Sequence, residues 1–404
     1  MVVPAVTPAV TDYRIIDVDT HVTEPPDLWT SRVPARMRDL VPSVATDRRG
    51  RQSWYLQGHR IASVGFTAVA GWTEPLSEGG PLTLDQLHPA AHDAGARLRY
   101  MDSEGIWAMV LYPNVGGFGS QGFLRLKDPD LMLTCVQAYN DFQTEWASAD
   151  PRRLLPVTAT PFWDVEATVA EVRRGHELGH RGILFTGEPE SFGQPFLADR
   201  YWDPLWAVAE ELELPISFHI GSGDFEKDFS PERVRTYGFP AAYARVSTNL
   251  FLGNGFHLCD LLLSGVLPRF PRLQVVSVES GIGWVPFLLE AIDHQFEEAD
   301  VRRARPEFEL KPSEYFARQV SICYWFEQVG PQRLIDCIGA DRIMIETDFP
   351  HPTCLYGNVW DRIDGGLAGQ SDDVRHRILW ANAERLYKVE GPTAADRAAL
   401  AAGS

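Results

Sequence analysis

Short apolar runs recur along the whole chain, and stretches with a helical repeat separate them. Runs of this kind, bounded by glycine, proline or charged residues, are typical of strands that are buried on both faces. Eight of them are present, at residues 14–21, 108–114, 154–162, 182–187, 215–222, 273–280, 320–326 and 342–349. The pattern therefore predicts eight strands, and continuous apolar strands are characteristic of parallel sheets.

The segments between these runs favour helices, because their apolar side chains recur every three to four residues. We expect helices at residues 130–149, 164–178, 204–213, around 248–264, 285–298 and 331–338. Strands that alternate with helices build a parallel sheet, and eight such units close into a barrel. The expected fold class is α/β, with a (β/α)8 or TIM barrel.

One stretch interrupts this alternation. Residues 31–94 contain "DRRGRQSWYLQGHRIASVGF", with the alternation of a hairpin, and then the Gly/Pro-rich "GWTEPLSEGGPL". We interpret this stretch as an insertion after the first strand, and we expect it to cover the barrel mouth, since the loops after strands surround the site in this fold. Residues 390–404 are expected to form a peripheral helix or tail, so residues 1–404 make up one barrel domain.

The composition narrows the classes of partner. With a formal net charge of -18, the chain is a poor match for nucleic acid, which proteins bind largely through Lys and Arg. The five cysteines form no CxxC pair, so neither a disulfide framework nor a thiolate zinc site is indicated. No run approaches the ~20 apolar residues of a membrane span, and the first residues lack the pattern of a signal peptide. We therefore expect a cytoplasmic homodimer with a small-molecule substrate.

Polar side chains gather where three of the predicted strands end. The first strand, "IIDVDTH", carries Asp17, Asp19 and His21 at alternate positions, which would put them on one side. The fifth strand ends at His219 and the eighth at Asp348. Two imidazoles and two carboxylates suit Zn²⁺, Mn²⁺ or Fe²⁺, and the positive ion would compensate the buried carboxylates. We predict one divalent metal on Asp19, His21, His219 and Asp348, with zinc as first choice and manganese or iron as alternatives.

These motifs resemble a known family. D-x-D-x-H-x-x-E-P on the first strand, F-H-x-G on the fifth and T-D-F-P-H on the eighth look like the amidohydrolase superfamily, specifically the branch related to aminocarboxymuconate semialdehyde decarboxylase. The resemblance covers roughly residues 13–390. It implies that Asp19 stands where many relatives have the first His of H-x-H, and that His21, His219 and Asp348 complete the ligand set.

The sequence departs from that branch after the sixth strand. Decarboxylases of the branch have a histidine there that works as acid and base, whereas this chain has "VSVESGIG", with Glu279 or Ser280 at that place. Hydrolysis is less affected, because the metal activates the water and Asp348 can act as base. We therefore expect a metal-dependent hydrolase of a small carboxylated or cyclic substrate. The alternatives are a non-oxidative decarboxylase (carboxy-lyase) of an aromatic or muconate-type acid, and a non-catalytic ligand-binding barrel.

Further candidates lie close to the same strand ends. Asp348, Glu279 and His351 are the expected catalytic residues, although His351 fits a supporting or a rim position equally well. A structural ion pair is the alternative for Glu279, and a strand-end cap is the alternative for Asp17. The expected substrate pocket comprises Glu24, Trp29, Tyr112, Asn114, Trp163 and Trp325. Core packing would also explain most of the twelve tryptophans, and Glu24 could simply turn the chain.

Overall fold

The computed structural model describes residues 12–74, 80–224 and 229–403. Residues 1–11, for which the sequence indicates no signal peptide, lie outside these ranges. So do residues 75–79 of the insertion and residues 225–228 of the loop after the fifth strand. All eight predicted strands are present and parallel. They are β1 (Ile15–His21), β5 (Ile106–Tyr112), β6 (Leu154–Ala159), β7 (Gly182–Leu184), β8 (Ile216–His219), β9 (Val275–Val278), β10 (Val320–Tyr324) and β11 (Ile343–Ile345).

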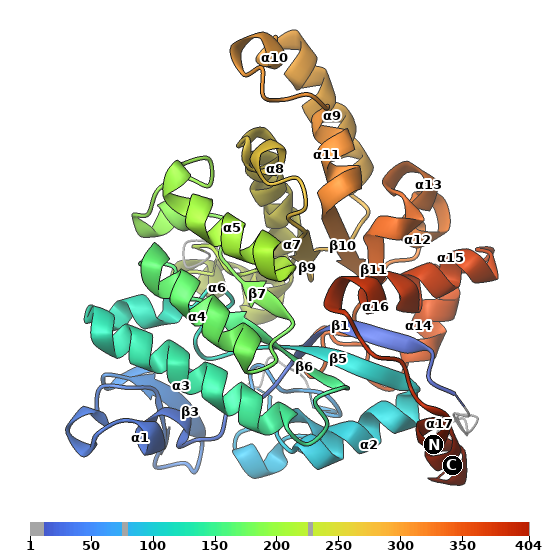
Figure 1. The fold of residues 1–404 in the computed structure, drawn as a ribbon. Helices are drawn as coiled ribbons and strands as arrows, with labels where there is room; N and C mark the ends of the chain where they lie inside the picture. The colour runs from blue at the N-terminus through green and yellow to red at the C-terminus, as the bar shows by residue number, and fades with distance from the viewer. Residues whose placement is uncertain (1–11, 75–79, 225–228, 404) are drawn as a thin grey trace.

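The first and last strands meet and nearly close the sheet into a barrel (Figure 1). Each of these eight strands pairs with the next one of the eight along the chain, in the order β1, β5, β6, β7, β8, β9, β10 and β11. At the remaining seam, the His21 N–H donates to the Phe349 carbonyl over 2.7 Å and the Asp348 N–H donates to the Asp19 carbonyl over 3.0 Å. The expected TIM barrel is therefore confirmed, and the seam brings the ends of its first and eighth strands side by side.

Helices surround the barrel, and every predicted helical segment contains at least one (Figure 1). The helices are α1 (Leu28–Arg32), α2 (Ala94–Glu104), α3 (Pro129–Ala147), α4 (Val165–Glu177), α5 (Asp203–Leu212), α6 (Pro231–Tyr237), α7 (Phe239–Leu263), α8 (Val266–Arg269), α9 (Val285–Glu298), α10 (Val301–Ala304), α11 (Pro312–Gln319), α12 (Val329–Arg333), α13 (Ile335–Ile338), α14 (Val359–Gly366), α15 (Asp372–His376), α16 (Asn382–Tyr387) and α17 (Ala394–Gly403).

The helices differ from the sequence prediction in two ways: one begins earlier than expected, and several, including α2, α6, α11 and α14, were not predicted. The helix expected around residues 248–264 begins much earlier, at Phe239, with Pro240 in its first turn, where a proline costs no hydrogen bond. Helix α2 was not predicted at all, because charged and small residues interrupt its apolar stripe. It is defined by its ends instead: the Asp93 carboxylate caps the Ala96 N–H, and Gly105 ends the helix in the left-handed conformation.

A β-bulge in β1 lies between Asp17 and Thr20, within the stretch to which the sequence assigned simple alternation. Asp17 is opposite Met109 and Thr20 is opposite Leu111, so three steps along β1 match two along β5. The register shift shows that simple alternation does not hold between Asp17 and Thr20, so whether Asp17 shares a side with Asp19 stays a prediction. The Asp17 carboxylate accepts the N–H of Thr347 over 2.9 Å and its hydroxyl over 2.6 Å, which ties β1 to the chain after β11.

The insertion is built around a small antiparallel sheet of β2 (Ser43–Thr46), β3 (Gln52–Leu56) and β4 (His59–Ser63). Its hairpin alternation is visible in the sequence. Beyond this sheet, the N–H groups of Val69 and Ala70 both donate to the Pro350 carbonyl, over 2.9 and 3.1 Å. This part of the insertion thus lies beside the loop that follows β11, at the end of the barrel where the predicted ligands are.

Within the described residues, no helix is both long enough and apolar enough to cross a membrane.

Candidate metal centre and active site

The four predicted ligands lie together at the carboxyl ends of β1, β8 and β11. The Nε2 atom of His21 is 3.4 Å from Oδ1 of Asp19 and 3.4 Å from Oδ1 of Asp348. The Nε2 atom of His219 is 3.5 Å from the same Oδ1 of Asp19. All four side chains are fully buried. We call Asp19, His21, His219 and Asp348 the metal centre.

The atoms that face each other in the metal centre have no hydrogen-bond partner among the described residues. They are both carboxylate oxygens of Asp19, Nε2 of His21 and Nε2 of His219, whereas Oδ1 of Asp348 lies 2.7 Å from Nδ1 of His351. Buried polar atoms are normally paired, so a convergent group of unpaired ones needs a common partner. Two donor atoms that each lie about 2.1 Å from one ion are about 3 to 3.5 Å apart. The pairs His21–Asp19, His21–Asp348 and His219–Asp19 have separations of this size. Ligand atoms of Asp19, His21, His219 and Glu279 all lie within 4.8 Å of one another, and so do those of His21, Glu279, Asp348 and His351. The cluster around His21 therefore suits a divalent cation.

Backbone carbonyls set the orientation of both metal-centre imidazoles. His21 donates from Nδ1 to the Pro113 carbonyl over 3.0 Å, and His219 donates from Nδ1 to the Ile220 carbonyl over 2.8 Å. A proton on Nδ1 leaves the Nε2 lone pair free to bind a metal. Burial, and next the nearby His351, lowers the pKa of His21 to about 4, so this ring is neutral near pH 7.

Glu279 lies in the loop after β9 and reaches the edge of the metal centre. Its Oε2 atom is 3.5 Å from Nε2 of His219. Burial raises the pKa of Glu279 well above its usual range, and the carboxylates of Asp348 and Asp19 raise it further. A divalent cation in the centre would lower this pKa again. Ser280, the other candidate at this place, shares a hydrogen bond of 2.8 Å with Ser277, so Glu279 is the one at the metal centre.

His351 bridges Asp348 and Asn114. Its Nδ1 atom is 2.7 Å from Oδ1 of Asp348, and its Nε2 atom is 2.8 Å from Oδ1 of Asn114. Both ring nitrogens of His351 therefore face oxygen atoms, and the ring is held between these two side chains. Although burial alone would raise the pKa of Asp348, His351 and His21 hold it below its usual range. The ring of His351 also stacks on that of His21, with the centroids 3.6 Å apart.

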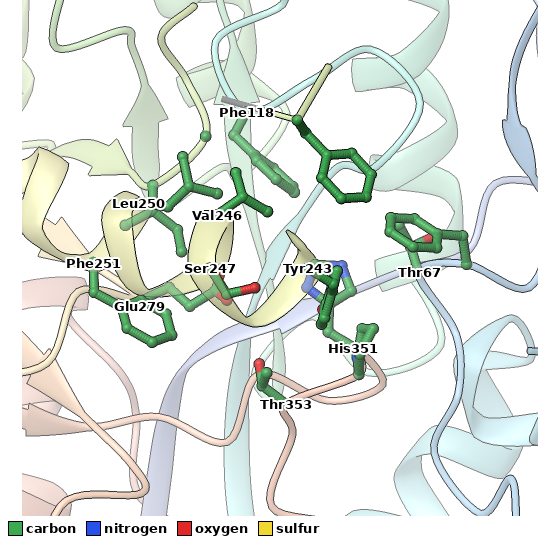
Figure 2. Close-up of a pocket in the computed structure, with 15 residues that line it drawn as sticks. Thr67, Phe118, Tyr243, Val246, Ser247, Leu250, Phe251, Glu279, His351 and Thr353 are labelled. Atoms are coloured by element: carbon green, nitrogen blue, oxygen red, sulfur yellow. The ribbon is translucent and has the colours of Figure 1, made fainter. Parts of the chain in front are cut away.

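A largely apolar pocket opens beside Glu279 and His351 (Figure 2). We call it the apolar pocket. Its walls come from the insertion, from the loops after β5, β8, β9 and β11, and from α7. The lining residues are Phe66, Thr67, Phe118, Ile220, Gly221, Phe229, Tyr243, Val246, Ser247, Leu250, Phe251, Glu279, His351, Pro352 and Thr353.

None of the six residues predicted to form the substrate pocket is among those that line the apolar pocket. Glu24 accepts the N–H groups of Asn114 and Val115 over 2.8 and 3.0 Å, so it shapes the loop after β5. Asn114 orients His351, as described above. The Tyr112 hydroxyl is 2.9 Å from that of Ser217, with its ring beside His219 at 5.2 Å between centroids. These three side chains therefore hold the loop and the rings next to the metal centre and do not line the apolar pocket.

The three tryptophans predicted for the pocket pack elsewhere. Trp29 is fully buried and donates to the Cys135 carbonyl over 3.0 Å. Trp163 packs beside Phe162. Trp325 is also fully buried and lies behind the pocket wall, where its ring meets Phe251 edge-on at 5.3 Å. The core-packing alternative therefore accounts for Trp29 and Trp325, because strand ends hold core residues as well as site residues.

Sequence reasoning missed two groups that contact the centre. Phe118, in the glycine-rich segment after β5, stacks on His219 with 4.2 Å between ring centroids. Glu346 is fully buried at the end of β11, and its Oε2 atom accepts the Glu279 N–H over 3.0 Å. The position of Glu346, two residues before Asp348 in "IETDF", was the one available indication, because a buried carboxylate needs a partner.

Comparison with known proteins gives the relationships of the chain. A family model described as Amidohydrolase matches residues 16–389. A gamma-resorcylate decarboxylase from Rhizobium radiobacter is 27% identical over 313 residues, which are 73% of this chain and 87% of that protein.

Two solved structures share the fold. An amidohydrolase from Mycobacterium avium subsp. paratuberculosis K-10 has a TM-score of 0.75 at 23% identity, covering 93% of this chain and 99% of its own. A 5-carboxyvanillate decarboxylase from Novosphingobium aromaticivorans, solved with manganese and 4-hydroxy-3-methoxy-5-nitrobenzoic acid, has a TM-score of 0.66 at 20% identity, covering 95% and 98%.

Proposed function

This chain belongs to the amidohydrolase family, and we propose that it is a metal-dependent enzyme that releases the carboxyl group of an aromatic or similarly unsaturated acid as carbon dioxide, without oxidation. Membership of the family confirms the resemblance inferred from the strand-end motifs. The expected hydrolase gains no support from the relatives, whereas the alternative of decarboxylation agrees with the names of a sequence relative and a structural neighbour.

One observation carries the proposal: two protonatable side chains, Glu279 and His351, line the same pocket and also lie within ligand distance of the metal centre. When bound, the divalent ion would hold the substrate carboxylate with an adjacent oxygen and draw electron density away from the ring. The apolar pocket would hold the rest of the substrate. The reaction then still requires an acid in the pocket that can give a proton to the substrate.

We assign that acid to Glu279. In the reaction the bond between the ring carbon and the carboxylate breaks, carbon dioxide leaves, and the bonding electron pair stays on the ring carbon. A proton must then be delivered to this carbon. Glu279 borders both the metal centre and the pocket, so its carboxyl group is placed to deliver a proton there. In this assignment Glu279 takes the part of the histidine that is missing after the sixth strand.

His351 and Asn114 have a positioning part. Asp348 would serve poorly as the base of a hydrolase, because His351 and His21 hold its pKa below the usual range despite its burial. The ring nitrogens of His351 face oxygen atoms of Asp348 and Asn114, so the ring fixes the Asp348 carboxylate for the metal. This arrangement favours decarboxylation over hydrolysis by a strand-eight base.

The donor set also bears on the identity of the metal. Two of the four residues of the metal centre, Asp19 and Asp348, offer carboxylate oxygens, and carboxylate ligands suit manganese. A structural neighbour was solved with manganese. We therefore propose manganese in place of zinc, which was the first choice from the sequence.

The proposal is tested by following the carboxyl carbon and the solvent proton together. The manganese-loaded full chain is incubated in D₂O with gamma-resorcylate and with salicylates that carry apolar ring substituents, each ¹³C-labelled in the carboxyl group. We expect labelled carbon dioxide and one deuterium at the vacated ring carbon. Cleavage of ester, amide or lactone analogues with ¹⁸O uptake from water, and no carbon dioxide from any acid, would overturn the proposal in favour of hydrolysis.

A further inference from the structure

We infer that the substrate carries, besides the carboxyl group that it loses, a bulky uncharged apolar body that fills the apolar pocket beneath α7. The inference rests on the proposed function, because it takes the metal centre as the place where the carboxyl group binds. It adds the substrate class, which neither the sequence motifs nor the relatives define.

One face of α7 forms the long wall of the pocket. Tyr243, Val246, Ser247, Leu250 and Phe251 follow one another at steps of three, one, three and one residues, which is the spacing of a single helix face. Figure 2 shows Val246, Ser247 and Leu250 on this helix, with Phe118 on one side of the pocket and His351 and Thr353 on another. The wall is continuous and apart from hydroxyl groups it is apolar.

Aromatic side chains also contribute to the other walls. Phe118 connects the pocket to the metal centre through its stacking on His219. Phe66 of the insertion meets Tyr243 edge-on, with 6.0 Å between ring centroids, and so closes the pocket on the side of the insertion. A flat or branched hydrocarbon group would find aromatic surface on these walls, which favours its burial.

The charged groups of the pocket are confined to one end. Among its described lining residues they are Glu279 and His351, both beside the metal centre. The remaining lining offers hydroxyl groups, including those of Thr67, Ser247 and Thr353, and apolar surface. A second carboxylate on the substrate would lie against this surface without a counter-charge, and an unpaired buried charge is costly. Substrates with two carboxylates are therefore disfavoured.

The affinities of three probes test the inference in the unmodified protein. Salicylate, 5-phenylsalicylate and 5-carboxysalicylate share the chelating head and differ in what would enter the pocket. We expect the manganese-loaded full chain to bind 5-phenylsalicylate at least about tenfold more tightly than salicylate, because the phenyl group leaves water. We expect 5-carboxysalicylate to bind no more tightly than salicylate. The reverse order, or no binding of any probe, would overturn the inference.

Two substitutions on α7 locate the effect. Leu250 lines the pocket, whereas Leu252, two residues further, is 50% exposed and is not part of the lining. Leu250→Arg should weaken 5-phenylsalicylate binding by about tenfold or more and strengthen that of 5-carboxysalicylate, because it replaces apolar surface by a cation. Leu252→Arg should change neither. Equal effects of the two variants would contradict the placement, and if Leu250→Arg does not fold, the wild-type comparison still decides.

Binding and turnover separate this inference from the proposed function. The predicted order of affinities without any carbon dioxide release would leave the apolar substrate class standing and remove the decarboxylase. Carbon dioxide release together with a preference for 5-carboxysalicylate would do the opposite.

Discussion

At the scale of single residues, the site depends on two side chains with unusual backbones. Glu279 and Asp348 both have a φ of +58°, in the left-handed region that non-glycine residues rarely enter. Such a conformation costs of the order of 1 to 3 kcal/mol and persists only where the surroundings fix it. Glu346 holds the Glu279 N–H, and the Asp19 carbonyl accepts the Asp348 N–H over 3.0 Å. The folded protein thus tolerates this unfavourable backbone conformation, which directs the two carboxylates into the site.

Glu279→Gln tests the proton role. The amide keeps the size of the side chain and removes its acid, so we expect turnover to fall by about 10² to 10⁴, the usual contribution of a general acid. Metal content should stay close to that of the wild type, since the four residues of the metal centre are unchanged. The pH profile of kcat/KM should also lose one of its limbs, which a purely structural change would not cause.

Ser280→Ala is the matched control, because Ser280 is the neighbouring residue that the sequence left open as an alternative. Its hydroxyl bonds to Ser277 and not to the metal centre, so turnover should change little. Normal turnover of Glu279→Gln, or a large loss in Ser280→Ala, would show that Glu279 is not the acid.

At the scale of elements, the strands were predictable and the pocket wall was not. Each strand of the barrel is a short apolar run, and its polar end projects to the one rim where all carboxyl ends meet. The strands together with the motifs at their ends therefore predicted the four metal-centre residues. The bulge in β1 depends on pairing with β5 and leaves no mark in the alternation of Asp17, Asp19 and His21. The first half of α7 follows Gly238 and contains Pro240, which hid the helix that forms the wall.

His180 joins α3 to β6 away from the site and allows a prediction on pH and stability. Its ring is buried, with Nε2 at 2.9 Å from the Thr144 hydroxyl and Nδ1 at 3.0 Å from that of Thr158. Burial, and next the charge of Arg174, lowers the pKa of His180 to about 3. Below pH 6.5 the unfolded chain therefore binds a proton at this residue that the folded chain does not, so acid destabilises the fold.

The expected magnitude follows from this linkage. Between pH 6.5 and pH 5, the neutral buried ring should cost the wild type about 1 to 2 kcal/mol of its free energy of unfolding. His180→Gln has no such proton, so its stability should fall less over the same interval. Urea unfolding of both proteins at the two pH values measures the difference. Parallel losses in the two proteins would mean that His180 is protonated in the folded state.

At the scale of the whole molecule, the barrel strands hold the metal centre, whereas α7, the insertion and the loops shape the pocket. The metal centre lies at the seam between β1 and β11 and across from β8, so it requires the closed sheet. The apolar pocket lies outside this frame, between α7, the insertion and the loops. The strand-end residues could therefore be foreseen from the family pattern, whereas the pocket lining could not, because it depends on how separate loops pack together.

The most direct test of this account is anomalous diffraction from crystals of the full chain grown with manganese, recorded on both sides of the manganese absorption edge. We predict one strong peak per chain, about 2.0 to 2.3 Å from side-chain atoms of Asp19, His21, His219 and Asp348. Crystals of His219→Ala grown in the same way should have a weaker peak or none. A peak at any other place, or no peak in crystals of the unmodified chain, would contradict the account.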